Sequence, residues 1–352
     1  FTLINLMSQT GFNPSYRKSP RGEYSVTACV EAIMAGDRNA LSYAITLSES
    51  QNELAREKAY KMLHLLAESP GKDRTKRITI TGAPGAGKST FIEHFGKYLL
   101  KKGHKTAVLA IDPSSQLSHG SIMGDKTRME ALSTDPRAFI RPSSAGAMLG
   151  GVAQGTKESI FLCEKAGYDC VLVETVGVGQ SESMASTITD MTLLLVQPGA
   201  GDDIQGIKRG ILEMTDLIVV NKADGVQLDL AQNTRRAYNS AMGLFQNRIE
   251  GFSVQVILAS SIEDSGFDAI YEQINQFFTH LEKQQQLHHL RQRQEVQWFD
   301  FMLRERALQW IMQNGNMENR LIDLKKQMLN DELSGFLALE EALKTLKTRH
   351  FS

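Results

Sequence analysis

The sequence has no long hydrophobic run and almost no net charge. No stretch reaches the roughly 18–20 consecutive apolar residues that span a bilayer, and residues 1–22 lack the charged and apolar segments of a signal peptide. The 39 basic and 40 acidic residues nearly cancel, so no overall field attracts nucleic acid or an acidic membrane. These absences predict a soluble cytoplasmic protein with no nucleic-acid or membrane partner.

Cysteine is scarce as well. Cys29, Cys163 and Cys170 are far apart or lie in apolar surroundings, and none belongs to a C-x-x-C pair. We therefore expect three reduced thiols, which is the usual state of cysteine in the cytosol.

The N-terminal part of the chain divides into two regions. Residues 1–22 are polar and rich in turn-forming residues, so we expect a flexible lead-in. Residues 23–75 show apolar residues at helical spacing and predict an N-terminal helical subdomain. Gly36 interrupts this pattern, and Asp37 is placed to cap the helix that follows.

The rest of the chain predicts a central domain and a tail. Residues 76–281 alternate short runs of Val, Ile and Leu with helical or loop segments, which suits an α/β domain with a mostly parallel sheet. Residues 282–352 return to a helical pattern, with Gln and Arg at the expected surface positions. A tail of this size builds little core alone, so it should pack on the central domain or on a second copy of the chain. Strands are expected at residues 77–81, 106–111, 170–174, 191–196, 217–221 and 254–258, with a short candidate at 139–141.

A glycine-rich turn follows the first expected strand. In RITITGAPGAGKSTF, the residues Gly82, Gly87, Lys88 and Ser89 match the P-loop pattern G-x-x-x-x-G-K-[ST]. The backbone N–H groups of such a turn close around phosphate oxygens at a helix N-terminus. The lysine reaches the β and γ phosphates, and the hydroxyl binds Mg²⁺. The expected nucleotide contacts are Gly82, Ala83, Pro84, Gly85, Ala86, Gly87, Lys88, Ser89 and Thr90.

A second motif predicts which base is bound. The expected strand at 217–221 ends in Asn221-Lys222-Ala223-Asp224, the N-K-x-D pattern of guanine-binding proteins. The Asp224 carboxylate would accept hydrogen bonds from the two donors on the guanine edge, whereas adenine would leave it unpaired at a cost of about 1–3 kcal/mol or more. Asn221 should tie this loop to the P-loop, and Lys222 should lie along the base. Backbone N–H groups of Ser260 and Ser261, after the last strand, should complete a pocket for GTP or GDP.

Two apolar strands deliver carboxylates, Asp112 and Glu174, to the edge where α/β sheets bind ligands. Mg²⁺ takes one or two carboxylates beside phosphate oxygens, which suits both residues. Gly177 lies three residues after Glu174 and could present its N–H to the γ-phosphate. Val178 follows, where Ras-type proteins have a water-positioning Gln, so we expect slow intrinsic hydrolysis that a partner or a dimer accelerates.

Two long loops rich in glycine and charge follow expected strands, at residues 115–130 and 198–210. Loops of this kind at strand ends are often functional, but a flexible surface loop explains the pattern too. The residues alone leave both interpretations open.

The segments GAPGAGKST, AIDPSS, GDKTRM, ETVGVGQSE, GDDIQGIKRGI and NKAD, in this order, resemble the methylmalonyl-CoA mutase-associated GTPases of the MeaB type, also labelled ArgK or LAO/AO transport ATPase. The resemblance implies a P-loop GTPase domain between the N-terminal helices and a C-terminal dimerisation arm. It implies functional roles for Lys88, Glu174 and Gly177 in catalysis. It implies Mg²⁺-linked positions at Asp112, Asp125 and Glu174 beside Ser89. It also implies three nucleotide-sensing segments, the third carrying Asp202, Asp203, Gln205 and Lys208, of which Lys208 would communicate with a mutase.

The resemblance further implies a homodimer that gates adenosylcobalamin loading from an adenosyltransferase and protects the mutase. Methylmalonyl-CoA mutase is the expected client, although isobutyryl-CoA mutase or another acyl-CoA mutase fits the sequence equally well. An ATPase or kinase linked to lysine, arginine and ornithine transport is an alternative, which Asp224 opposes. A non-enzymatic scaffold on a decayed domain is another, which the complete P-loop opposes. The sequence has neither the His-rich tracts nor the C-x-C-C motif of related metal-delivery proteins.

Overall fold

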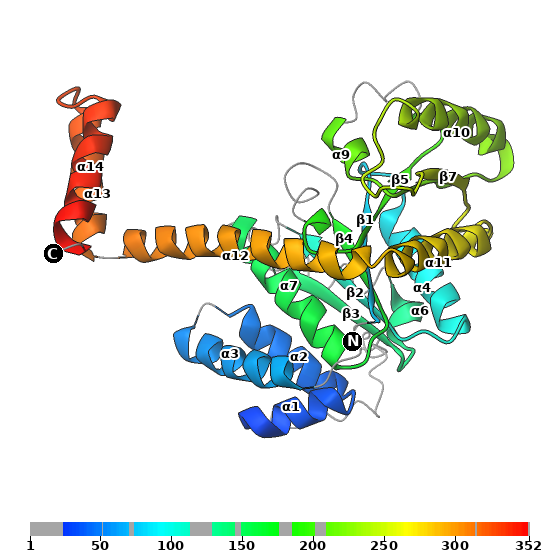
Figure 1. Ribbon diagram of the computed structural model, residues 1–352, viewed down its shortest axis with the longest axis horizontal. Coiled ribbons are helices and arrows are strands. Elements are labelled where there is room, and N and C mark those ends of the chain that lie inside the picture. Colours follow the sequence, from blue (N-terminus) through cyan, green and yellow to red (C-terminus); the bar gives the residue numbers. More distant parts are fainter. Residues whose placement is uncertain are drawn as a thin grey trace, which may run out of the picture.

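The computed structural model describes residues 24–50, 52–69, 74–112, 129–144, 149–175, 185–200, 209–313 and 315–350. A β-sheet with helices on both faces forms the body, a helical subdomain lies beside it, and a long helical arm leaves it (Figure 1). Within the described residues, no helix is long and apolar enough to cross a membrane. The predicted lead-in at residues 1–22 lies outside the described part of the chain.

In the part of the chain that the structure describes, the sheet has seven strands in the order β3-β2-β4-β1-β5-β6-β7, and every neighbouring pair is parallel. All seven expected strands are confirmed, and the sheet is wholly rather than mostly parallel. Because the strands are parallel, their carboxyl ends lie at one edge, with the central strand β1 between β4 and β5. The strands are β1 (Lys76–Thr81), β2 (Thr106–Asp112), β3 (Ala138–Ser144), β4 (Cys170–Thr175), β5 (Met191–Val196), β6 (Leu217–Val220) and β7 (Gln255–Leu258).

Side-chain caps begin the first three helices. Ser25 caps α1, and Asp37 caps α2 as predicted, accepting hydrogen bonds from the N–H groups of Asn39 and Ala40. Asn52 caps α3 in the same way. The helices are α1 (Val26–Met34), α2 (Arg38–Ser48), α3 (Glu53–Glu68), α4 (Lys88–Lys101), α6 (Glu130–Ser133), α7 (Leu149–Lys165), α9 (Arg209–Glu213), η2 (Gly225–Gln227), α10 (Leu228–Met242), α11 (Phe267–Lys283), α12 (Gln286–Gln313), α13 (Gly315–Leu329) and α14 (Gly335–His350).

The two faces of the sheet are packed differently. On one face, a single hydrophobic cluster that includes Ile78 and Ile80 joins the strands to α4, α6 and α11. On the other face, one cluster lies beneath α1, α2, α3 and α7, and a separate cluster lies beneath α9 and α10. Thr79 and Thr81 of β1 and Thr175 of β4 alternate with the residues of the first face, so they point toward the second face. These three residues, here called the threonine row, lie between the two clusters of the second face.

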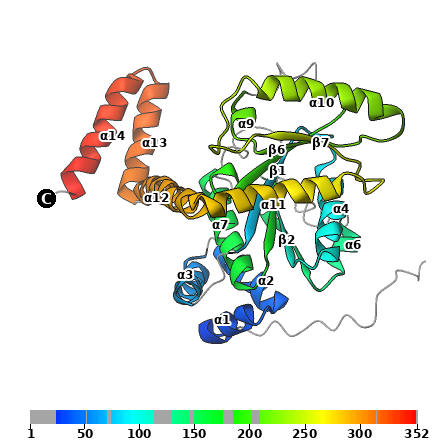
Figure 2. The ribbon, with the colours of Figure 1, turned by 45° about the vertical axis from the view of Figure 1, so that its right-hand side comes forward.

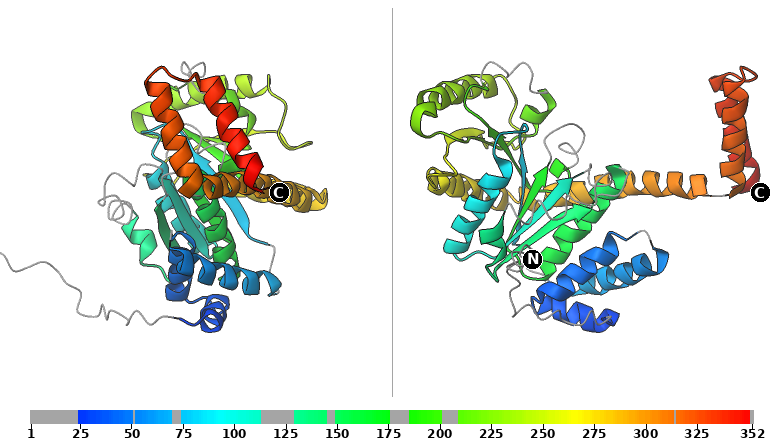
Figure 3. Two further views of the ribbon diagram at one scale, coloured as in Figure 1. Left: turned by 90° about the vertical axis from the view of Figure 1, so that its left-hand side faces the viewer. Right: turned by 180° about the vertical axis from the view of Figure 1, so that it is seen from behind.

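The arm, α12 to α14, extends away from the body. Helix α12 leaves the sheet beside α7, and the hairpin of α13 and α14 stands at its far end (Figure 2). The view from behind shows the same separation between hairpin and body (Figure 3, right). The hairpin has a small core of Met317, Leu324, Ala338 and Ala342. Many large apolar side chains of the arm are exposed: Phe299, Leu303, Leu308, Trp310, Met312, Ile322, Met328, Leu329, Phe336, Leu337, Leu339 and Leu343.

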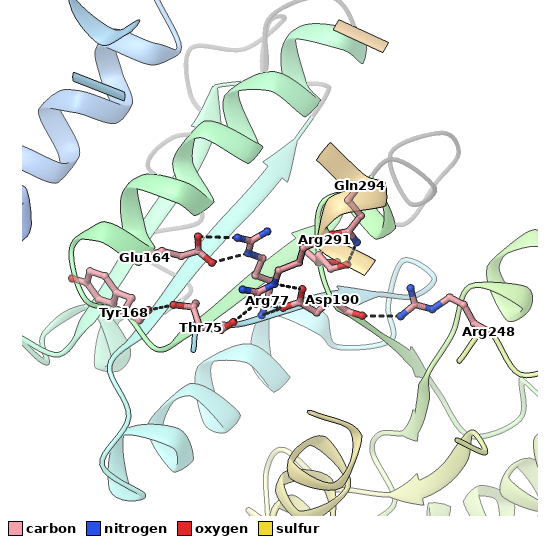
Figure 4. A network of polar contacts seen from close by, with 9 residues as sticks. Thr75, Arg77, Glu164, Tyr168, Asp190, Arg248, Arg291 and Gln294 are labelled. Atoms are coloured by element: carbon pink, nitrogen blue, oxygen red, sulfur yellow. Dashed lines mark hydrogen bonds and ion pairs between the residues drawn. The ribbon is translucent and has the colours of Figure 1, made fainter. Parts of the chain in front are cut away.

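The root of the arm is fixed by buried polar contacts (Figure 4). Arg291 of α12 donates to both carboxylate oxygens of the fully buried Asp190, at 2.9 and 2.8 Å, and to the Thr75 carbonyl at 2.6 Å. One helical turn further on, the Gln294 side chain donates to the Thr189 carbonyl at 2.7 Å. The prediction that Gln and Arg of this tail lie at the surface is therefore wrong for these two side chains, because they satisfy polar groups at the start of β5.

Further along, α12 also contacts α7 and the N-terminal subdomain. Lys157 of α7 lies 2.8 Å from the Glu295 carboxylate and 4.4 Å from the ring centroid of Trp298. Burial lowers the pKa of Lys157, and its pairing with Glu295 opposes that shift. Arg306 then donates to the hydroxyl of Tyr60 on α3 at 2.6 Å. The tail therefore packs on the central domain along its first half, while its far end projects.

Candidate functional site

The P-loop connects β1 to α4 at the carboxyl edge of the sheet, as the sequence predicted. Gly82 begins it with φ 151°, and a Cβ there would lie 2.1 Å from the Leu195 carbonyl oxygen of β5. Gly87 ends it in the left-handed region, with φ 85°, and precedes the first residue of α4. Only glycine fits both positions, because one lacks room for a side chain and the other needs a positive φ.

The Lys88 side chain folds back onto the start of this turn. Its ammonium group donates to the carbonyl oxygens of Gly82 at 2.7 Å and Ala83 at 3.2 Å. The charge is thereby held beside the first turn of α4, where the helix N-terminus already favours anions. The geometry can therefore bring a point charge and backbone N–H groups to one phosphate chain.

The base motif is joined directly to the P-loop. The Asn221 side chain, 1% exposed, donates to the Ala86 carbonyl at 3.0 Å, which is the link the sequence predicted. Lys222 adopts φ 58°, and its ammonium group donates to the Gly85 carbonyl at 2.7 Å. Two consecutive residues thus fix the loop after β6 against the turn after β1, so a base and a phosphate chain would be held at a set separation.

Ser260 and Ser261 contribute side-chain contacts that the sequence did not predict. The Ser261 hydroxyl donates to the Asn221 side-chain oxygen at 2.9 Å, and the Ser260 hydroxyl donates to one carboxylate oxygen of Asp224. Ser260 in turn accepts from the Glu263 N–H at 3.1 Å. The expectation of backbone contacts from this segment stays a prediction. An ionised carboxylate has about four lone-pair positions, so Asp224 can still accept from a guanine edge.

Ser89 and Glu174 form the candidate metal side of the site. The Ser89 hydroxyl donates to a Glu174 carboxylate oxygen at 2.8 Å, across the 85 residues that separate them in sequence. Asp112 ends β2, next to β4 at the same edge of the sheet. Among the described residues, no cluster of three or more His, Cys, Asp or Glu side chains could hold a metal ion. A hydroxyl and a carboxylate nevertheless fit Mg²⁺, which takes few protein oxygens and completes its shell with phosphate and water.

Several predicted site residues lie outside the part of the chain that the structure describes. They are Gly177, Asp125, Asp202, Asp203, Gln205 and Lys208. Their assigned roles therefore stay predictions from the resemblance.

The three cysteines are free thiols and do not join the site. Cys29 and Cys170 are buried, and burial raises the pKa of Cys29 to about 11 and that of Cys170 to about 12. Burial also raises the pKa of Cys163. The prediction of reduced thiols fits these positions, because a buried neutral thiol neither binds metal nor exchanges readily.

Comparison with known proteins identifies a family. The family model described as "Methylmalonyl Co-A mutase-associated GTPase MeaB" matches residues 41–316. The mouse protein named "Methylmalonic aciduria type A homolog, mitochondrial" is 41% identical over 326 residues, covering 90% of this chain and 79% of its own length. The Escherichia coli protein named "GTPase ArgK" is 38% identical over 329 residues, covering 94% and 99%.

The fold comparison agrees. A solved structure titled "Crystal structure of LAO/AO transport system kinase" has a TM-score of 0.72 and 32% sequence identity, covering 94% of this chain and 100% of its own. The seven-stranded parallel sheet, the P-loop and the guanine motif of this chain lie within the matched regions. The chain belongs to the MeaB family of methylmalonyl-CoA mutase-associated P-loop GTPases.

Proposed function

We propose that this GTPase gates adenosylcobalamin loading into a cobalamin-dependent acyl-CoA mutase and protects that mutase from inactivation. Methylmalonyl-CoA mutase is the expected client, because the family description names that mutase. An adenosyltransferase is proposed as the cofactor donor. The observation that carries the proposal is the hydrogen bond from Asn221 to Ala86. This bond joins the loop after β6, which carries the N-K-x-D motif, to the P-loop. The family of the chain is named for its association with a mutase.

Each site residue has a proposed task. Lys88 neutralises the β and γ phosphates, and Asp224, with Asn221 and Lys222 beside it, selects guanine. Ser89 and Glu174, with Asp112 and Asp125, would hold Mg²⁺, and Gly177 would sense the γ-phosphate. Mg²⁺ supplies neutralisation of charge that develops on the transferred phosphoryl group. Hydrolysis is slow without a partner, because Val178 stands where Ras-type proteins have glutamine.

The exposed apolar side chains of the arm support a homodimer. Phe336 is 88% exposed and Leu329 is 84% exposed, and they belong to α14 and α13. These two helices form the hairpin that stands apart from the body (Figure 3, right). A concentration of exposed large apolar side chains on one pair of helices is typical of an interface. Replacing Phe336 and Leu329 together by Glu should convert a dimer to a monomer in sedimentation velocity. Leu244, which is 88% exposed on the body, provides the matched control, since Leu244→Glu should leave the dimer intact.

The functional test measures GTP turnover with and without purified methylmalonyl-CoA mutase, and co-purification of the two proteins with a non-hydrolysable GTP analogue. We expect a complex and an increased turnover. The Asp224→Asn variant should show less of both at a limiting nucleotide concentration, because it would bind guanine nucleotide more weakly. No complex and an unchanged rate with any cobalamin-dependent acyl-CoA mutase would refute the proposal.

One structural relative supports a second candidate function. The solved structure noted above carries a transport-kinase title, and it aligns over nearly the whole of this chain. Asp224 of the N-K-x-D motif favours guanine instead, because its carboxylate would accept from the two donors on the guanine edge and would be left unpaired beside adenine. ATP affinity equal to GTP affinity would favour the transport-linked ATPase or kinase.

A further inference from the structure

Two buried threonine hydroxyls lie at the edge of the sheet that carries the candidate nucleotide site. Thr81 is 1% exposed and Thr175 is fully buried. Neither hydroxyl oxygen has a hydrogen-bond partner in the part of the chain that the structure describes. Buried polar groups are nearly always paired with protein or ordered water, because leaving one unpaired costs free energy. Two neighbouring buried hydroxyls of this kind therefore indicate a partner that is not a protein group of the described residues, such as an ordered water molecule.

Their positions place them next to each other. In the β1–β4 ladder, Ile80 is paired with Glu174, and this is the last pair. Thr81 and Thr175 are the next residues of the two strands, and both belong to the threonine row on the second face. Neighbouring strands lie about 4.8 Å apart, while two successive O–H···O hydrogen bonds span up to about 5.6 Å. One water molecule therefore fits between the two hydroxyls.

Thr79, the third member of the threonine row, has a hydrogen-bond partner. Thr79 lies two residues before Thr81, and its hydroxyl is 2.7 Å from the Thr189 hydroxyl. This pair lies toward the middle of the sheet, where the chain before β5 covers the row. Among the described residues, the hydroxyls of the row that have no partner are therefore those of Thr81 and Thr175, at the end that borders the candidate nucleotide site.

Each of the two residues adjoins a group of the candidate site. Thr81 directly precedes Gly82, whose carbonyl oxygen accepts from Lys88. Thr175 directly follows Glu174, whose carboxylate accepts from Ser89. Main-chain pairing between β1 and β4 has ended at this point. A link between the two hydroxyls would therefore set the distance between the P-loop, which holds Lys88, and Glu174, which belongs to the candidate metal site.

We propose that Thr81 and Thr175 together bind one water molecule and act as positioning residues for GTP hydrolysis. The water replaces the missing ladder contact and holds the ends of β1 and β4 at a fixed distance. Buried water commonly makes two to four hydrogen bonds to groups that are otherwise unpaired, and two hydroxyls meet that need. The inference rests on the GTPase activity of the family and not on the proposed mutase partner.

The test compares the loss of the hydroxyl with the loss of the methyl group. Thr81→Val and Thr175→Val keep the shape and remove the hydroxyl, whereas Thr81→Ser and Thr175→Ser keep the hydroxyl. We expect both Val variants to unfold at the same or a higher urea concentration than the parent. Their kcat should fall about tenfold, with KM for GTP nearly unchanged, since one positioning interaction is lost. The Ser variants should keep most of kcat although they unfold more easily.

If the two hydroxyls share one water molecule, the effects of the two Val substitutions on kcat should not add. The double Val variant should lose no more kcat than either single variant, because removing one hydroxyl already removes the bridge. Thr106 is the matched control, since its hydroxyl is also buried and has no partner among the residues that the structure describes. It lies at the first residue of β2, at the opposite edge of the sheet. Thr106→Val should leave kcat unchanged.

Three results would overturn the proposal. The first is a kcat for both Val variants that equals that of Thr106→Val. The second is a loss in the Ser variants as large as in the Val variants, which indicates packing alone. The third is a high-resolution crystal structure of the nucleotide-bound protein with no density between the two hydroxyls. The crystal structure also decides the matter if a Val variant fails to fold.

Discussion

Replacing Arg291 by Met should detach the root of the arm before the body unfolds. The variant removes the two charged hydrogen bonds to Asp190, at 2.9 and 2.8 Å, and the one to the Thr75 carbonyl. Asp190 is fully buried, and breaking such a pair by removing one partner costs about 3–5 kcal/mol. We expect the lower end, about 3 kcal/mol, because the Arg77 N–H still donates to Asp190 at 3.1 Å.

Tryptophan fluorescence can follow this detachment separately. The chain has two tryptophans, and both Trp298 and Trp310 lie on α12. Trp298 lies against Lys157, whereas Trp310 is exposed, so a Trp310→Phe background isolates the signal of the root. In this background, Arg291→Met should move the Trp298 transition to a lower urea concentration than the circular-dichroism transition. In the parent, the two transitions should coincide.

A double-mutant cycle and a matched arginine complete the experiment. Asp190→Asn with Arg291→Met should cost less than the sum of the single changes, with a coupling energy of about 1–3 kcal/mol. Arg320 is the control, since its pairs with Asp323 and Glu341, at 3.1 and 3.5 Å, are much more exposed than the pair of Arg291 with Asp190. Arg320→Met should cost less than about 1 kcal/mol. If Arg291→Met shifts the Trp298 transition no further than Arg320→Met, the root is not held in the way described.

Two other substitutions test the candidate site, and one labelling reaction tests the core. Asp224→Asn should weaken GTP binding at least about tenfold in calorimetry, because a charged acceptor is replaced by a group that also donates; equal affinity would contradict the base assignment. Gly82→Ala should abolish nucleotide binding or folding, since its Cβ would lie 2.1 Å from the Leu195 carbonyl oxygen, whereas Gly210→Ala, with open space around it, should be silent. At pH 8, a thiol reagent should label none of the three buried cysteines quickly, because burial raises the pKa of each, to about 11 for Cys29 and about 12 for Cys170. A rapidly labelled thiol in the native protein would show that the core opens.

The sequence predicted the strands and the P-loop well, because both are local signals. Runs of Val, Ile and Leu lie in the strands, and the cap at Asp37 depends on the two or three residues that follow it. The link from Asn221 to the P-loop was predicted as well, through a motif whose chemistry requires it.

Other features depend on pairs that no local pattern reveals. Arg291 reads as a surface residue in a polar helix, and only the distant Asp190 makes it an anchor. The Ser260 hydroxyl was likewise missed, because its partner is fixed by the pairing of β6 with β7. A hydroxyl donor at a strand end beside a known carboxylate is the signal that could have found it.

The central position of β1 has a consequence for the order in which the protein is made. The P-loop strand is completed only by β4 and β5, and the tie between Ala86 and Asn221 joins residues 135 apart in sequence. At the roughly 5–20 residues per second of protein synthesis, a nascent chain exposes its glycine-rich turn for many seconds before the base loop emerges. The hydrogen bond between the two loops therefore forms late, after the P-loop and the strand β6 have both left the ribosome.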